Sequence, residues 1–187
     1  MKWLFPLVFI TSCSSAPIEQ PDPKPPADPP NKANVEKLVA CGATDCGASA
    51  QRIEGGVPFA MYNMACVVQA LRDRTPGSYN VKLDHTWSNG SENADMYLRV
   101  LASGDVMVAT HRSLQIDGQP LEETWDLVRR CSLVTPNFFD TCLTAVQMGQ
   151  GPDATPEAWD CVFPESAVST FALPWFTMCL EAVPVCE

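Results

Sequence analysis

The sequence predicts an α+β fold in which one helix packs on a four-stranded antiparallel meander, followed by a short, disulfide-stapled helical segment at the C-terminus. Three observations carry this prediction: helical spacing over residues 58–73, strand-like alternation within residues 78–133, and five cysteines crowded into residues 131–186. The chain has 187 residues, 46% of them hydrophobic. That length suits a single folded domain with a core of its own.

The first predicted element is a mostly buried helix over residues 58–73. Pro58 suits a first helical turn because its missing N–H would have no partner there. Apolar side chains from Phe59 to Leu71 keep near-helical spacing, and the run Thr75-Pro76-Gly77 ends the pattern. We expect this helix to cover the apolar face of the sheet.

The period then changes to two, which indicates a half-buried strand. Its apolar side carries Tyr79, Val81, Leu83, His85 and Trp87. Polar turns at residues 88–93, 102–105 and 117–120 separate it from three further strands. These are expected over residues 96–101, 106–112 and 123–133. Because the connections are short, the four strands should form an antiparallel meander.

The C-terminal part returns to helical patterns. Thr135-Pro136 and Thr155-Pro156 both resemble a helix N-cap followed by proline at the first position. We expect helices near 136–148, 156–161 and 174–182. Such short helices bury little surface each, so this part should depend on covalent cross-links.

The N-terminus has the layout of an export signal. Lys2 precedes eight apolar residues, Trp3–Ile10, which is far too short to span a bilayer. Ile10-Thr11-Ser12-Cys13 then resembles the lipobox of bacterial lipoproteins, although Leu and Gly or Ala are commoner at the first and third places. The resemblance implies that residues 1–12 are removed and that Cys13 carries diacylglycerol and an N-acyl chain such as palmitate. The alternatives are an ordinary cleaved signal or a cytoplasmic protein with an apolar start.

Residues 13–35 are expected to form a proline-rich tether, followed by one disulfide-rich globular domain over 36–187. Residues 14–34 hold seven prolines, which indicates an extended spacer of ~3.1 Å per residue that reaches up to ~65 Å. Ser14, rather than Asp, follows the lipobox cysteine, and the resemblance to bacterial lipoproteins then implies the outer membrane. The lipobox, the tether and the even number of remaining cysteines together resemble the cysteine-rich lipoproteins of myxobacteria. This resemblance implies no particular activity.

Once Cys13 is lipidated, eight cysteines remain, and an even count in an exported protein indicates four disulfides with 105 pairings. They are Cys41, Cys46, Cys66, Cys131, Cys142, Cys161, Cys179 and Cys186. Cys41 and Cys46 are close enough to close a small loop. Cys66 should pair at long range, with Cys131 as the favoured partner. Zinc is the rival use, but the chain has no Cys-x-x-Cys and only two histidines.

The charge excludes one class of partner. A net charge of −10 is unlike the basic face of a nucleic-acid-binding protein. Residues 131–187 contain seven carboxylates and no Lys or Arg. We interpret this segment as a solvated surface, with an acidic partner-binding face as the alternative.

The sequence offers no catalytic set, metal site or cofactor motif. No Gly-x-Ser-x-Gly, His-Glu-x-x-His or phosphate-binding loop occurs. His85 is interpreted as a core histidine, and His111 should lie ~9–10 Å or more from it, with one strand between, which is too far to share a zinc ion. The oxygen side chains of residues 89–95 are interpreted as a polar turn, with a Ca²⁺ loop as the alternative.

A carboxylate site is the alternative to a chain without catalytic groups. Glu122, Glu123 and Asp126 surround Trp125, and a glycosidase would need two carboxyls facing each other across a cleft. Trp87 and Trp125 are candidates for lining a ligand groove. The sequence therefore favours a membrane-anchored lipoprotein that is a non-enzymatic binding or envelope-interaction module, with the membrane and a protein or other envelope ligand as partners. The alternative is a hydrolase with an unfamiliar carboxylate/His site.

Overall fold

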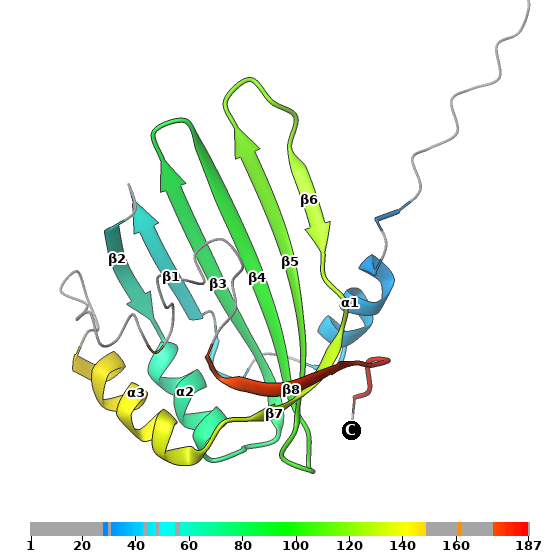
Figure 1. Ribbon diagram of the computed structural model, residues 1–187, viewed down its shortest axis with the longest axis vertical. Helices are drawn as coiled ribbons and strands as arrows, with labels where there is room; N and C mark the ends of the chain where they lie inside the picture. The colour runs from blue at the N-terminus through cyan, green and yellow to red at the C-terminus, as the bar shows by residue number, and fades with distance from the viewer. Residues whose placement is uncertain are drawn as a thin grey trace, which may run out of the picture.

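The computed structural model describes residues 28–29, 31–42, 45–47, 49–54, 57–148, 161 and 174–186. Within them, three helices pack against an eight-stranded, mostly antiparallel sheet (Figure 1). The predicted α+β class is therefore confirmed, with a larger sheet than expected. None of the described helices is both long and apolar enough to cross a membrane.

The elements follow one another in a mixed order along the chain. They are α1 (Lys32–Val39), β1 (Ser49–Glu54), β2 (Val57–Tyr62), α2 (Met64–Arg72), β3 (Gly77–Trp87), β4 (Gly90–Val100), β5 (Val106–Ile116), β6 (Glu122–Trp125), β7 (Arg129–Leu133), α3 (Pro136–Met148) and β8 (Phe176–Glu181). The strand order is β2-β1-β3-β4-β5-β7-β8. The short strand β6 also pairs with β5, at a stretch of β5 further along the chain than the one that pairs with β7. Among the strands of the described ranges, only the β1–β3 pair is parallel.

The long hairpins β3–β4 and β4–β5 form the predicted meander. Each strand has 11 residues, and the register runs without a shift from Gly77 opposite Val100 to Trp87 opposite Gly90. The predicted fourth strand over residues 123–133 is instead two strands. The chain leaves β5 after β6, where the Asp126 N–H donates to the Thr110 carbonyl at 2.9 Å, and it rejoins β5 as β7.

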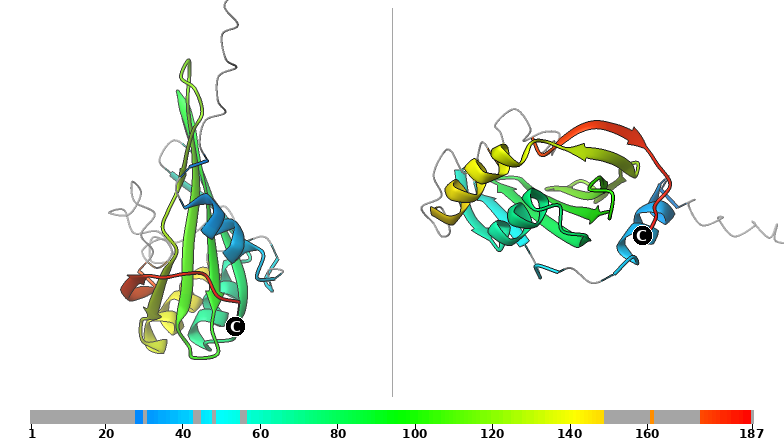
Figure 2. Two further views of the ribbon diagram at one scale, coloured as in Figure 1. Left: turned by 90° about the vertical axis from the view of Figure 1, so that its right-hand side faces the viewer. Right: turned by 90° about the horizontal axis from the view of Figure 1, so that it is seen from below.

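The sheet buries both of its faces at one end, and the second view of Figure 2 shows helices on either side. We call the side covered by α2 and α3 the two-helix face. Its core includes Val67, Leu71, Val81, Leu98, Val106, Phe139, Val146 and Trp175. We call the opposite side the α1 face, where a smaller cluster contains Val35, Leu38, Leu101, Met107, Ala109 and Val128. The helix expected to cover the sheet therefore does so together with α3.

Two helix predictions need correction. Residues 57–62 form the edge strand β2, and the helix begins only at Met64, after Asn63 turns the chain with a positive φ of 55°. Pro58 suits this place because an edge strand tolerates a missing donor. The helix expected over residues 174–182 is strand β8, which pairs with β7. The helix over residues 136–148 is confirmed, while residues 156–160 lie outside the described part.

Helix α1 was not predicted. It begins at Lys32, inside the stretch expected to be tether, so the last residues of that stretch are helical. Val35 and Leu38 are spaced i, i+3 and therefore share one helix face, which is buried against the sheet. This short apolar pair is what draws the helix onto the α1 face.

The prediction of disulfide bonds is confirmed, and the two specific pairings are wrong. The four bridges are Cys41–Cys186, Cys46–Cys66, Cys131–Cys179 and Cys142–Cys161. Cys66 lies on the exposed side of α2, whereas Cys131 is 2% exposed within the sheet core, so the two cannot meet. Cys131 instead reaches the neighbouring strand β8. Cys41 joins the end of α1 to the C-terminal segment rather than closing a small loop.

Candidate functional site

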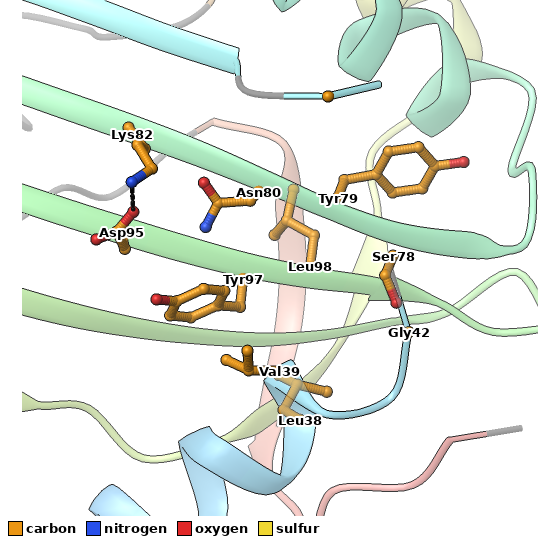
Figure 3. A pocket seen from close by; sticks show the side chains of 11 residues that line it. Leu38, Val39, Gly42, Ser78, Tyr79, Asn80, Lys82, Asp95, Tyr97 and Leu98 are labelled. Atoms are coloured by element: carbon orange, nitrogen blue, oxygen red, sulfur yellow. Dashed lines mark ion pairs between the residues drawn. The ribbon is translucent and has the colours of Figure 1, made fainter. Parts of the chain in front are cut away.

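A pocket of about 260 Å³ opens on the α1 face, between the end of α1 and strands β3 and β4 (Figure 3). Apolar, polar and charged groups share its wall. The lining residues are Leu38, Val39, Gly42, Gly47, Ser78, Tyr79, Asn80, Lys82, Asp95, Tyr97 and Leu98. This is smaller than a typical drug-sized site of ~300–1,000 Å³, so its occupant must be small.

Strand alternation delivers the polar side chains to one place. Asn80 and Lys82 are two residues apart on β3 and therefore share the α1 face. Their cross-strand partners on β4 are Tyr97 and Asp95, respectively. Directly opposite side chains have Cβ atoms within ~5.5 Å, so these four groups form one polar patch on the sheet.

Asn80 is the most unusual member of the patch. The residue is only 8% exposed, and its amide has no hydrogen-bond partner among the described residues. Figure 3 shows its amide group among the pocket-lining side chains. The Asn80 amide atoms are not among the fully buried polar atoms that lack a partner, so they are open to the pocket, where a ligand can donate to them and accept from them.

Lys82 and Asp95 form an ion pair with 3.3 Å between Nζ and Oδ1. Asp95 Oδ1 is buried and the ion pair gives it no well-directed hydrogen bond. Burial raises the pKa of Tyr97, and the Asp95 carboxylate raises it further. The Tyr97 hydroxyl therefore stays neutral at physiological pH and can both donate and accept a hydrogen bond.

The polar row continues from the pocket across the sheet. Asp95 lies opposite His111 on β5, and His111 lies opposite Trp125 on β6. The two rings stack with centroids 3.9 Å apart and planes 18° apart, and His111 Nε2 lies 3.5 Å from a carboxylate oxygen of Glu123. Lys32 Nζ lies 5.9 Å from the centre of the Trp125 ring, so α1 also contacts this cluster.

The other predicted site residues are dispersed. His85 is half-buried beside Trp87, with ring centroids 5.0 Å apart, so its interpretation as a core histidine is wrong. His85 lies opposite Glu92 on β4, and His111 lies opposite Asp95 on the same strand. Glu92 and Asp95 are an odd number of residues apart, so their side chains, and those of the two histidines, point to opposite faces of the sheet. The single strand predicted between them, β4, is confirmed.

The predicted tryptophan groove does not exist, because Trp87 lies on the two-helix face and Trp125 on the α1 face. Glu122 and Glu123 are adjacent on β6 and point to opposite faces, so they do not face each other across a cleft. Asp126 instead pairs with Arg112 at 3.0 Å.

Residues 90–95 belong to strand β4 rather than to a metal-binding loop. Throughout the described ranges, no group of three His, Cys, Asp or Glu side chains is placed to hold a metal ion.

Sequence reasoning missed Asn80 and Tyr97. It placed Asn80 on the solvent side of its strand, because α1 was assigned to the tether and nothing was expected to cover that side. The available signal was the apolar pair Val35 and Leu38 at the end of the proline-rich stretch. No protein-family model matches the chain, and neither the curated proteins nor the solved structures give a significant match.

Proposed function

We propose that the protein is an exported lipoprotein, anchored in the outer membrane through Cys13, whose folded domain is a non-enzymatic binding module. The lipobox resemblance, the proline-rich stretch and the four disulfides support export and anchoring. The pocket on the α1 face supports binding. The observation that carries the proposal is Asn80, a residue only 8% exposed whose amide lines this pocket and has no hydrogen-bond partner among the described residues.

The pocket chemistry defines the ligand as small and polar, with both hydrogen-bond donors and acceptors. The Asn80 amide offers both kinds of group, the Tyr97 hydroxyl does the same, and Asp95 Oδ1 needs a donor. A volume of about 260 Å³ corresponds to roughly nine water molecules at ~30 Å³ each. Leu38 and Val39 supply an apolar wall. A monosaccharide or an amino acid has this combination of size and chemistry.

Binding is favoured over catalysis by how the charged groups are used. Lys82 and Asp95 neutralise each other, so neither is a free acid or base aimed at a substrate.

The ligand-binding proposal is tested by thermal unfolding of the full chain with a panel of monosaccharides and amino acids. We expect at least one compound to raise Tm, and we expect Asn80→Leu and Tyr97→Phe to abolish the rise. Asn93→Leu is the matched control, since Asn93 is exposed on β4 outside the pocket. No shift with any compound, or equal loss in the control, would contradict the proposal.

The anchor is tested separately. Cys13→Ala should release the protein from the membrane fraction, because two or more acyl chains at ~0.8 kcal/mol per buried methylene are its expected attachment. Equal incorporation of radiolabelled palmitate into wild type and variant would rule out Cys13 as the lipidated residue.

A hydrolase remains the second candidate, because His111 Nε2 lies 3.5 Å from Glu123. A carboxylate can orient an imidazole that acts as a base. Chromogenic esters and glycosides provide the test. Turnover that is lost in both His111→Asn and Glu123→Gln would favour the enzyme, whereas absence of turnover in the wild type would favour the binding module.

A further inference from the structure

The sheet extends beyond the helices at the end where β5 turns into β6 (Figure 1). A second hollow lies at this turn, lined by residues that do not line the pocket on the α1 face. The hollow has a volume of about 610 Å³ and lies between the end of β5 and the turn that leads to β6. It is lined by Leu114, Ile116, Gln119, Pro120, Leu121 and Glu122. Leu121 is 56% exposed and Ile116 is 36% exposed, which leaves an apolar surface open to solvent.

A tryptophan extends this surface across two more strands. Trp87, Gly90 and Ile116 are successive cross-strand partners on the two-helix face. A Cβ atom at Gly90 would lie 2.9 Å from Trp87 Cζ2, so the indole rests directly on the glycine. The next row, toward the helices, contains His85, Glu92, Leu114 and Glu122. We call the set Trp87, Leu114, Ile116, Pro120 and Leu121 the distal platform.

The charges around the distal platform are mostly negative. Among the described residues, three nearby carboxylates form no ion pair, namely Glu92, Asp117 and Glu122. Arg112, on the same face of β5, already pairs with Asp126 at 3.0 Å. Burial raises the pKa of Glu92 by more than the nearby Arg112 guanidinium lowers it, so Arg112 compensates the buried carboxylate only in part.

We propose that the distal platform binds a segment of a partner protein that carries Lys or Arg side chains between apolar ones. The apolar side chains would fill the hollow against Leu114 and Leu121. A cation would lie between Glu92 and the Trp87 ring, where a carboxylate and an aromatic face both attract it. The same negative charge repels anionic lipid headgroups and nucleic acid, so it favours a basic peptide over these other surfaces.

Fluorescence anisotropy with the full chain at 0.15 M NaCl tests this proposal. The probe is a labelled 12-residue peptide that alternates Lys and Val. One matched peptide replaces Lys with Glu, and a second replaces Val with Ser. We expect saturable binding of the first peptide and affinities lower by about tenfold or more for the other two. Equal binding of the acidic peptide, or no saturable binding of any peptide, would overturn the proposal.

Variants locate the binding surface. Glu92→Gln with Glu122→Gln should weaken binding by about fivefold, since exposed ion pairs contribute modestly. Leu121→Ser should weaken it by about fivefold through lost apolar contact. Leu180→Ser is the matched control, because Leu180 is an exposed leucine on β8. Unchanged affinity in the first two variants, or an equal loss in the control, would place the peptide elsewhere and refute the proposal.

Two further measurements distinguish the distal platform from the pocket and from a membrane-binding surface. Asn80→Leu should leave peptide binding unchanged, because the pocket on the α1 face is independent of the distal platform. Vesicles that contain anionic phospholipid should not bind through the platform. Vesicle binding that Leu121→Ser abolishes, together with weak peptide binding, would assign the surface to a membrane and refute the peptide proposal.

Discussion

Replacing both Cys41 and Cys186 by serine should destabilise the protein more than removal of the short-range bridge Cys46–Cys66. The first bridge joins residues 145 positions apart, and the second joins residues 20 positions apart. A disulfide restricts the unfolded chain, and this restriction grows with the length of the loop that it closes. The two bridges are otherwise well matched, since each links one half-buried and one exposed cysteine.

The other bridges set the effective loop length. In the unfolded chain, the bridges Cys46–Cys66 and Cys131–Cys179 bypass two stretches of the chain. They shorten the loop that the Cys41–Cys186 bridge closes to about 80 residues. Chain entropy then gives about 4.5 kcal/mol for this bridge and about 3.3 kcal/mol for a 20-residue loop. We therefore expect the Cys41→Ser, Cys186→Ser variant to lose about 1 kcal/mol more than the Cys46→Ser, Cys66→Ser variant.

Urea unfolding followed by circular dichroism measures both losses. The m-value should rise in each variant, because the less constrained unfolded chain exposes more surface. Equal losses, or a larger loss for the Cys46–Cys66 variant, would refute the loop-length reasoning. A loss below about 1 kcal/mol in the Cys41–Cys186 variant would show that chain entropy does not govern this bridge.

Four further outcomes are expected. Trp175→Phe should cost about 2–3 kcal/mol in urea unfolding, because the buried indole N–H donates to the Cys161 carbonyl at 2.9 Å. Gly90→Ala should cost about 1–3 kcal/mol in the same assay, because its Cβ would contact Trp87 and the backbone of the neighbouring strand. Burial disfavours the charged form of Glu92 and raises its pKa above the ordinary value of 4.5. The protonated carboxyl therefore contributes its full share of folding stability below pH 4.5, and this share is lost as pH rises through the raised pKa. Glu92→Gln should therefore gain stability relative to wild type between pH 4 and pH 7 in urea titrations. Denatured without reductant, the eight cysteines of the domain should not label with maleimide, and two or more labelled sites would contradict the four bridges.

The sequence predicts the meander well because its signal is local. Tyr79, Val81 and Leu83 alternate with polar residues, and short polar turns leave antiparallel pairing as the only simple connection. Pro136 likewise marks the first residue of α3. Elements whose identity depends on distant partners were missed. Strand β8 is held by β7 and by the Cys131–Cys179 bridge, neither of which is visible in the local pattern.

The candidate site was harder to predict for the same reason. Asn80 and Tyr97 become pocket residues only because α1 packs on their face of the sheet, and α1 carries just two buried residues, Val35 and Leu38. Disulfide partners are equally non-local, since eight cysteines allow 105 pairings. Cys66 illustrates the limit, because its partner depends on which side of α2 it occupies rather than on its spacing.

The bridge between Cys41 and Cys186 also determines how the protein responds to mechanical force. It joins Cys41, two residues after the end of α1, to the last described residue of the chain, so all eight described strands lie inside one covalent ring. A pull applied between the two chain termini passes through the disulfide and bypasses the strands. In a single-molecule stretching experiment, the oxidised protein should extend only by the residues outside 41–186. If the N-terminal segment holds the protein to a membrane, tension on that segment would reach the C-terminus without unravelling the sheet.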